Sequence, residues 1–350
     1  MKVMLAMSGG VDSSVAGALL LGQGHDVVGV TMKLWGGDSD SGCCSVSDVD
    51  DARRVAQQLD IDHLVFNFGD DFNAHVVDPY VRDHALGVTP NPCIECNRHV
   101  KFDRLLRRAE QLGFDAVATG HHARIGRSVN GSLTLERGAD LAKDQSYVVH
   151  MLDQRALARS LFPVGDIDKV EVRRLAAEIG LRTASKPDSQ DVCFITSTGG
   201  RETFLGDRIS FRPGRVVALD GAELGRVEAV EMVTIGQRRG IGLPGGGPKR
   251  YVVDVDVPNS TVVVGDDGDL DRTSLLVERP TWIDTPIAGT VLVQCSAHGD
   301  ARPAALAPGC EADTVLVEWE QPQRRIAPGQ SVVFYDLADR CVLGGGVAAR

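Results

Sequence analysis

A glycine-rich turn directly after the first apolar run constrains this chain more than any other feature. Val3–Met7 has the pattern of a buried strand, the sequence SGGVDSS occupies 8–14, and Ser13–Gln23 has the spacing of a helix. This order places unbonded backbone N–H groups and the positive end of a helix dipole at the carboxyl end of a strand. We therefore expect a phosphate-binding loop, although no Lys follows the glycines as it does in the P-loop of the GxxxxGK[ST] type.

Strand and helix patterns alternate through the first half of the chain. Apolar runs at 27–33, 63–68 and 116–119 alternate with helical spacing at 47–59 and 102–112. This alternation predicts an α/β domain with a doubly wound parallel sheet at 1–203.

After about residue 205 the pattern changes to short strand-like runs separated by Gly, Pro and Asp. We expect a small β-rich domain at 204–268 and a C-terminal β-barrel-like domain at 269–350. The expected strands lie at 215–219, 230–235, 250–257, 261–265, 289–294, 313–319 and 330–335.

Eight cysteines in 350 residues are too sparse for a disulfide framework. Cys93 and Cys96 form a Cys-x-x-Cys in NPCIECN, and Cys193 lies in SQDVCFI. Such a pair is typical of half a zinc site, a redox pair or a nucleophile with a neighbouring thiol. No second Cys-x-x-Cys is present. The residues left to complete a zinc site are Cys43 and Cys44, or His121 and His122.

Taken together, these motifs resemble the tRNA-specific 2-thiouridylases, PP-loop ATP pyrophosphatases that thiolate the wobble uridine of tRNA. The resemblance extends over nearly the whole chain. It is carried by AMSGGVDSSVA (6–16), GCCS (42–45), TPNPCIECNRHVKF (89–102), ATGHHAR (118–124), KDQSYVVHML (143–152), FPVGD (162–166), KPDSQDVCFI (186–195), TIGQRRGIGL (234–243) and IAPGQSVVFY (326–335).

The resemblance implies a reaction and a set of site residues. ATP activates the uracil C2 oxygen as an adenylate, and Mg²⁺ arrives with ATP without side-chain ligands. Cys96 is the implied nucleophile and Cys193 the implied persulfide carrier, and the two form a transient disulfide. The implied ATP-binding residues are Ala6, Met7, Ser8, Gly9, Gly10, Val11, Asp12, Ser13, Met32 and Gly120. Those for tRNA are Asn91, Pro92 and Cys93 at the target base, and Lys143, Asp144, Gln145, His121 and Gln330 elsewhere.

Cys93 departs from the pattern of some family members, which carry Asp at this position, so the thiol is a candidate acid/base or redox helper. The sequence CSAHGD at 295–300 also departs from the basic-aromatic run of many members. Two alternatives stay open. An iron–sulfur cluster on Cys93, Cys96 and Cys193 could carry the sulfur, or the chain could be a PP-loop ligase or amidotransferase acting on a small molecule.

The net charge of -11 by itself argues against a nucleic-acid partner, but the charge is unevenly distributed. The segment 36–83 alone carries -8, and 236–250 has four basic residues and no acidic one. We expect the anticodon arm of tRNA to contact local patches, Arg238 and Arg239 among them, with strong salt dependence, while 36–83 faces away from the RNA.

The remaining expectations concern partners and location. A cysteine desulfurase or sulfur-relay protein is the implied sulfur donor. No apolar stretch reaches about 18 residues, so no membrane span is expected. The glycine turn follows Met1 too closely for a targeting peptide, so we expect a cytoplasmic protein.

Overall fold

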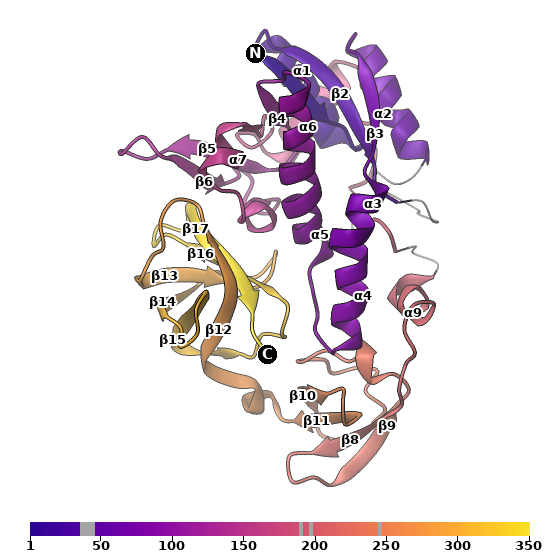
Figure 1. Cartoon of the computed structure of the whole chain (residues 1–350), viewed down its shortest axis with the longest axis vertical. Coiled ribbons are helices and arrows are strands. Elements are labelled where there is room, and N and C mark those ends of the chain that lie inside the picture. The colour runs from indigo at the N-terminus through magenta and orange to yellow at the C-terminus, as the bar shows by residue number, and fades with distance from the viewer. Residues whose placement is uncertain (36–45, 189–191, 196–198, 244–246) are drawn as a thin grey trace.

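The computed structural model describes residues 1–35, 46–188, 192–195, 199–243 and 247–350 (Figure 1). Its first layer is a five-stranded sheet in the order β3-β2-β1-β4-β7 with parallel pairings throughout. The strands are β1 (Lys2–Ala6), β2 (Asp26–Lys33), β3 (His63–Asn67), β4 (Ala116–Ala118) and β7 (Ser160–Leu161). The expected doubly wound parallel sheet is confirmed.

Side chains of β1 alternate between two apolar cores, one on each face of the sheet. Val3 and Leu5 pack with α1, α2 and α8, whereas Met4 packs with the helices of the opposite face. This period of two is what a strand buried on both faces requires. The helices of the first face are α1 (Val11–Gly22), α2 (Val46–Gln58) and α8 (Lys169–Glu178).

Two helical columns leave the opposite face of the sheet and run toward the middle of the molecule (Figure 1). One consists of α3 (Gly69–Phe72), η1 (Asn73–Val77) and α4 (Asp78–Ala85). The other consists of α5 (Pro92–Glu95), η2 (Cys96–Arg104) and α6 (Leu105–Gln111). The expected helix at 102–112 therefore begins earlier, because the side chain of Asn91 accepts hydrogen bonds from the N–H groups of Cys93 and Ile94 and caps a longer column.

Two β structures follow, as expected. The smaller is a four-stranded sheet in the order β10-β11-β8-β9. In the larger, the order is β12-β15-β14-β13-β16-β17, and β17 pairs back to β12 and closes a barrel. The strands are β8 (Gly214–Ala218), β9 (Glu223–Val227), β10 (Tyr251–Asp256), β11 (Thr261–Gly265), β12 (Asp271–Trp282), β13 (Gly289–Gln294), β14 (Arg302–Pro308), β15 (Thr314–Arg324), β16 (Ser331–Tyr335) and β17 (Cys341–Ala348).

The strand expected at 230–235 is wrong. Val230–Met232 forms a single 3-10 turn, η4. The turn buries Glu231, whose carboxylate accepts hydrogen bonds from the backbone N–H and the Nε of Arg212 at 3.1 and 2.8 Å. A buried carboxylate needs such partners, and meeting them overrides the β preference of the apolar residues around it.

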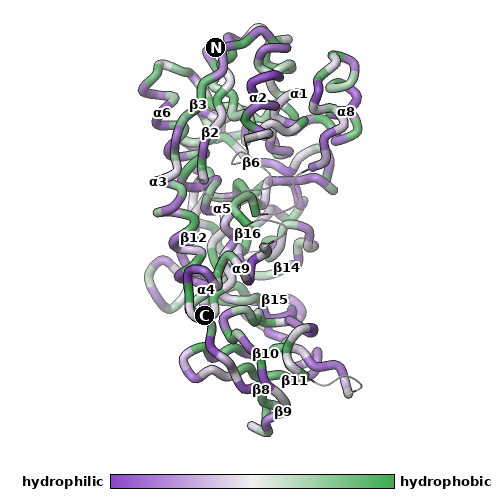
Figure 2. Tube along the Cα trace, turned by 90° about the vertical axis from the view of Figure 1, so that its right-hand side faces the viewer, coloured by the Kyte–Doolittle hydropathy of each residue, from purple (hydrophilic) through white to green (hydrophobic). Residues whose placement is uncertain are grey.

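A hairpin that follows β4 in the chain was not expected. Its strands β5 (Ala123–Arg127) and β6 (Leu133–Arg137) pair with each other, and β6 also pairs with β17 of the barrel. The hairpin therefore extends the barrel sheet to eight strands, while the parallel sheet of the α/β layer stays separate. Figure 2 shows apolar segments recurring from the sheet at the top to the small β structure at the bottom, and four separate apolar clusters underlie them.

The remaining short elements are η3 (Ser146–Val149), α7 (Gln154–Ala158), α9 (Gly200–Gly206) and η5 (Asp267–Leu270). None of the helices in the described ranges is both long enough and apolar enough to cross a membrane.

Candidate functional site

The glycine-rich turn lies where three neighbouring strands end. Gly9 has a φ of +74°, and a Cβ there would lie 2.3 Å from the carbonyl oxygen of Asp48. Gly120 follows β4, and a Cβ there would lie 2.6 Å from the backbone nitrogen of Ser13. Met32 lies on β2, the neighbour of β1 on the other side. The structure thus brings the predicted ATP residues together at the carboxyl edge of the sheet, where such sheets bind ligands.

The start of α1 is suited to an anion. Its N-cap is Gly10, which has no side chain to satisfy the first-turn N–H groups. The hydroxyls of Ser13 and Ser14 donate to the Gly10 carbonyl at 3.2 and 2.8 Å, which stiffens the turn. Ser8 is exposed at the mouth of the loop. Backbone N–H groups at the start of a 12-residue helix after a stiffened glycine turn have the chemistry to bind a phosphate.

Asp12, in the first turn of α1, is held by two side chains from distant elements. The Nζ of Lys169 donates to both carboxylate oxygens at 2.7 Å, and the Nε2 of His122 lies 3.1 Å away. Burial raises the pKa of Asp12, but the hydrogen bonds from His122 and Lys169 outweigh it and leave the pKa below its ordinary value. Asp12 is therefore an anion at neutral pH.

The stretch before residue 189 is bound to the phosphate loop. The Nζ of Lys186 donates to the Gly9 carbonyl at 3.0 Å and also contacts Asp48 and Asp51. Burial lowers the pKa of Lys186, but these carboxylates outweigh it and raise the pKa, so the ammonium stays charged. No local pattern in the sequence points to Lys169 or Lys186, because their partners Asp12 and Gly9 lie more than 100 positions away. Asp188 was likewise assigned no role, although its partners Lys143 and Arg173 lie only 45 and 15 positions away.

The three candidate thiols lie around one apolar cluster. Cys96 is buried within it, and the half-buried Cys193 packs against it. Cys93 is exposed on α5, three residues before Cys96. Residues three apart on a helical column share a face. The column therefore carries one exposed and one buried thiol, three residues apart.

Phe194 fixes the position of Cys193. Its ring lies 5.6 Å from Phe72, 5.5 Å from Tyr80 and 5.1 Å from Phe204, measured between ring centroids. Such tilted and edge-on pairs add to the stabilisation gained by burial. Burial raises the pKa of Tyr80, a nearby Arg201 lowers it, and the charge of Cys93 raises it further, which places Cys93 beside the same aromatic cluster.

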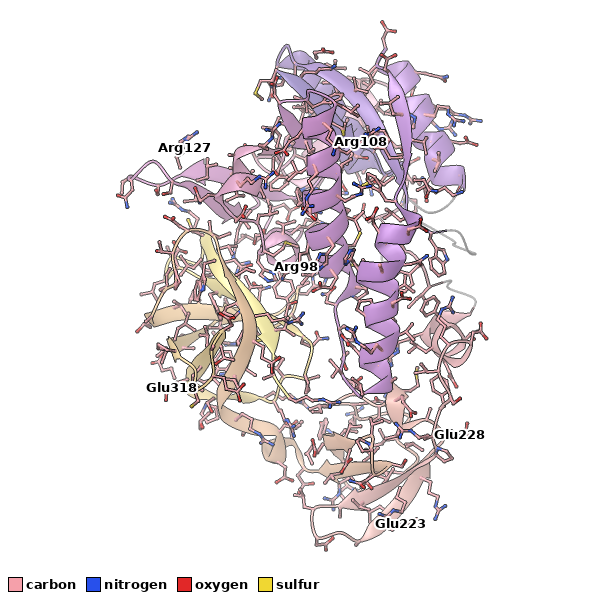
Figure 3. The ribbon with its side chains drawn as sticks, in the orientation of Figure 1. Arg98, Arg108, Arg127, Glu223, Glu228 and Glu318 are labelled. Carbon is pink, nitrogen blue, oxygen red and sulfur yellow. The ribbon has the colours of Figure 1, made fainter. Side chains whose placement is uncertain are left out.

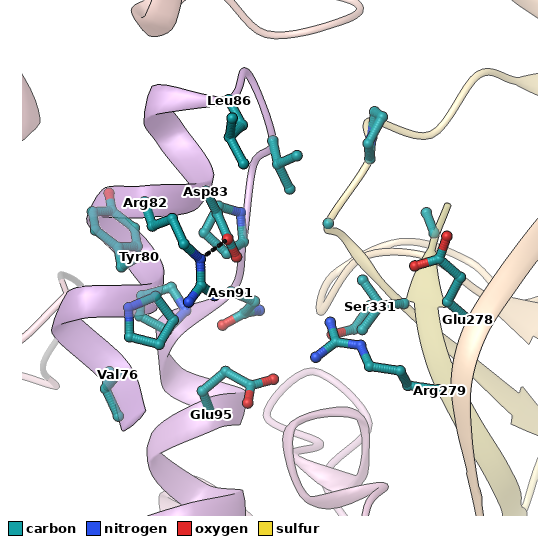
Figure 4. Close-up of a pocket in the computed structure, with 18 of the residues that line it drawn as sticks. Val76, Tyr80, Arg82, Asp83, Leu86, Asn91, Glu95, Glu278, Arg279 and Ser331 are labelled. Atoms are coloured by element: carbon teal, nitrogen blue, oxygen red, sulfur yellow. Dashed lines mark hydrogen bonds and ion pairs between the residues drawn. The ribbon is translucent and has the colours of Figure 1, made fainter. Parts of the chain in front are cut away.

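A cavity of about 400 Å³ separates the helical columns from the barrel (Figure 4). Glu95 from α5 and Arg279 from β12 point toward one another across it. Burial raises the pKa of Glu95, but His99 at 3.2 Å and Arg98 outweigh it and keep the pKa low. In Figure 3, Arg98 lies on the column at the side of the barrel. The cavity is lined by Asn91 and Pro92, and is of a size that holds a small ligand.

The predicted tRNA residues fall into two groups. Lys143 is 42% exposed, and Arg238 and Arg239 are exposed on a loop of the small β structure. The side chains of Asp144 and His121 instead point inward, with Asp144 5% exposed and His121 8% exposed. Burial lowers the pKa of His121 well below its ordinary value, so this imidazole is neutral.

Two further predicted residues make backbone contacts. The Oε1 of Gln145 accepts a hydrogen bond from the His122 N–H at 2.9 Å. The Nε2 of Gln330 donates to the Thr89 carbonyl at 2.7 Å, which ties the barrel to the segment before Asn91.

No cluster of three His, Cys, Asp or Glu side chains with metal-binding geometry exists in the described ranges. Cys43 and Cys44, named above as possible zinc ligands, lie outside the described residues. Both oxygens of Asp12 are engaged by Lys169, so this carboxylate does not fit a Mg²⁺ ligand in the present arrangement.

Comparison with known proteins gives matches over almost the whole chain. Residues 1–197 match the tRNA methyl transferase HUP domain, 202–266 the tRNA methyl transferase PRC-barrel domain, and 272–348 the aminomethyltransferase beta-barrel domain. The tRNA-specific 2-thiouridylase MnmA of Roseiflexus castenholzii is 47% identical, covering 100% of this chain and 99% of that protein. The protein of the same name from Chloroflexus aurantiacus is 47% identical, with 100% and 98% covered.

Proposed function

The chain belongs to the tRNA-specific 2-thiouridylase family, and from this premise we propose that it transfers sulfur to C2 of the wobble uridine of tRNA with ATP as co-substrate. It is a transferase, a tRNA-uridine 2-sulfurtransferase. One observation supports the chemistry most directly. Lys186 contacts the phosphate loop at the Gly9 carbonyl, and Phe194, the residue after Cys193, packs against Phe72 at the start of the column α3–η1–α4. These contacts support the proposal that ATP and sulfur chemistry take place in the same domain.

The first step solves a leaving-group problem. The C2 oxygen of uracil leaves poorly, so it attacks the α-phosphorus of ATP, pyrophosphate departs, and the oxygen becomes part of an AMP leaving group. The first-turn N–H groups of α1 and the glycine turn stabilise the charge that develops on phosphate. Because Asp12 is engaged by Lys169, we propose that Mg²⁺ is bound by the ATP phosphates.

The second step uses the two inner thiols. Cys193 carries a persulfide whose terminal sulfur attacks C2. The thiolate of Cys96 then attacks the Sγ of Cys193, the bond to the terminal sulfur breaks, and its electron pair remains on the sulfur at C2. The C2–O bond breaks, AMP leaves, and 2-thiouridine and a Cys96–Cys193 disulfide result. An external dithiol must reduce this disulfide before the next cycle.

Burial supports this division of roles. The position of Cys96 inside the apolar cluster shields the adenylate from water, whereas the half-buried Cys193 is accessible to a donor. The exposed Cys93 is the remaining candidate for proton transfer or redox assistance. We propose a cysteine desulfurase or sulfur-relay protein as donor and the cytoplasm as location.

For tRNA, we propose that the anticodon arm lies across the column and the barrel. The wobble base leaves the anticodon stack and is bound beside Asn91, Pro92 and Cys93. The 400 Å³ cavity adjoins Asn91 and Pro92, but its lining includes neither Cys96 nor the phosphate loop. Lys143 and the loop with Arg238 and Arg239 contact phosphates. We place the boundaries between the three domains after residues 203 and 268.

The decisive experiment measures 2-thiouridine in tRNA from cells that lack this protein and carry wild type, Cys96→Ser or Cys193→Ser. We expect wild type to restore the nucleoside and both variants to abolish it. Cys310→Ser is the matched control, because this exposed thiol lies on the barrel side of the chain and should leave thiolation unchanged. Unchanged 2-thiouridine in the deletion strain would refute the function.

A separate measurement distinguishes the persulfide from an iron–sulfur cluster. Protein purified without oxygen should be colourless, contain no iron and be fully active with a persulfide donor. A visible absorption band with stoichiometric iron, lost together with activity on chelation, would instead support a cluster on the three thiols.

A further inference from the structure

The carboxylate of Asp188 is shared by three cations. It lies 3.0 Å from the Nζ of Lys143, 2.9 Å from the Nζ of Lys169 and 2.9 Å from the Nη2 of Arg173. Burial raises the pKa of Asp188, but the hydrogen bonds from Lys169 and Lys143 outweigh it and lower the pKa to about 2. The side chain is thus an anion at any physiological pH.

Two of the three cations also face the substrate sites. Lys169 donates to both oxygens of Asp12 in the first turn of α1, where the ATP phosphates are placed. Lys143 is 42% exposed in the loop assigned to tRNA. A continuous chain of ion pairs therefore runs from the RNA side through Lys143, Asp188 and Lys169 to the phosphate loop.

The backbone around Asp188 does not depend on this carboxylate. The Nη1 of Arg173 donates to the carbonyls of Ala184 and Lys186 at 2.8 and 3.0 Å, and Lys186 itself is bound to Gly9. What the carboxylate adds is a negative charge between two lysines, at the start of the stretch that leads to Cys193.

We propose that Asp188 is a positioning residue whose carboxylate takes the place of substrate phosphate before the substrates bind. This inference rests on the proposed function through the placement of tRNA and ATP. The two lysines share one carboxylate. When an RNA phosphate binds Lys143, Asp188 therefore pairs more strongly with Lys169, and when the triphosphate binds Lys169, Asp188 pairs more strongly with Lys143. Each substrate thus weakens the binding of the other, and with both bound Asp188 keeps only its ion pair with Arg173.

The test uses Asp188→Asn, which keeps the shape and removes the charge. The matched control is Glu171→Gln, which removes one charge from an exposed pair with Arg174 on α8. Binding of an unmodified tRNA transcript is measured with and without α,β-methylene-ATP and Mg²⁺, and thiolation is measured in a single turnover. Asp188→Glu serves as the conservative variant.

We expect wild type to bind tRNA about 5- to 20-fold more weakly when the ATP analogue is present, within the usual range of coupling between sites. Asp188→Asn should bind each ligand about 5-fold more tightly and lose the antagonism, because no carboxylate then links the two lysines. Asp188→Glu should retain part of the antagonism, and Glu171→Gln should behave as wild type. A merely structural role would weaken binding and rate together.

Weaker binding of both ligands by Asp188→Asn, or antagonism that persists in it, would overturn the inference. So would a wild type that thiolates tRNA without any antagonism, and this outcome leaves the proposed function intact. A wild type that forms no 2-thiouridine would refute the proposed function instead. If Asp188→Asn does not fold, Lys143→Met provides the test, because the ATP analogue alone should then bind about 3- to 10-fold more weakly; unchanged binding contradicts the inference.

Discussion

Arg137 joins the α/β layer to the barrel, and its replacement by Met gives a quantitative test of the interface. The guanidinium donates to Asp144 at 2.8 Å, to Asp339 at 2.6 Å and to Gln294 at 2.9 Å. It also lies 3.8 Å above the ring of Tyr335. Met retains much of the aliphatic volume and removes the charge and every donor.

The cost follows from what each partner retains. Removing one member of a buried ion pair costs about 3–5 kcal/mol, because the other charge remains buried. Asp144 keeps hydrogen bonds from the Gly138 N–H, the Ser146 N–H and the Ser146 hydroxyl, and Asp339 is 48% exposed and recovers water. We therefore lower the expected loss to about 2–3 kcal/mol of local opening free energy, or about 30- to 150-fold in the opening equilibrium.

Amide hydrogen exchange measures this quantity locally. The Gly138 and Ser146 amides, which donate to Asp144, should exchange about 30- to 150-fold faster in Arg137→Met, while the amides of β1 keep wild-type rates. Arg127→Met on the same hairpin is the control. The Arg127 guanidinium lies at the exposed end of β5 in Figure 3, so the exchange of the Gly138 and Ser146 amides should be unaffected by its removal. Equal protection of Gly138 in wild type and Arg137→Met would refute the reasoning.

Three further predictions follow from other contacts. Gly9→Ala should raise the KM for ATP at least about tenfold in initial-rate assays. Gly24→Ala, with a similar φ of +78° and no atom within 4 Å of the new Cβ, should cost only about 1–2 kcal/mol of stability. Equal KM values for the two variants would contradict the clash with Asp48. Burial lowers the pKa of His84 to about 4, so the unfolded chain binds more protons than the folded chain between pH 4 and 6.5. The free energy of unfolding should therefore fall as the pH falls through this window. His84→Asn should flatten the pH dependence of the urea midpoint, and an unchanged slope would argue against this assignment. Arg239→Ala should reduce the slope of log Kd for tRNA against log salt by about 1 at unchanged kcat, and an identical slope would remove this loop from the RNA contact.

The sequence predicted the parts of the molecule that depend on local rules. The turn after the first apolar run was predictable because only glycine tolerates the backbone of Gly9 and the close approach of Asp48. Alternating periods of two and 3.6 residues identified the parallel sheet and its helices. The Asn130-Gly131 pair between two alternating runs also carried a usable hairpin signal that was overlooked.

Only the tertiary structure decided which distant residues meet. The sequence alone would place Asp144 at the surface. It is buried because Arg137 pairs with it and also with Asp339, which lies 202 positions after Arg137. Lys169 reaches Asp12 across 157 positions, and no periodicity records such a pair. Local backbone preference fixes turns and strands, whereas the pairing of buried charges is set by which surfaces the folded chain presses together. The glycine turn was therefore predictable from sequence, and the ion-pair chain from Lys143 through Asp188 and Lys169 to Asp12 was not.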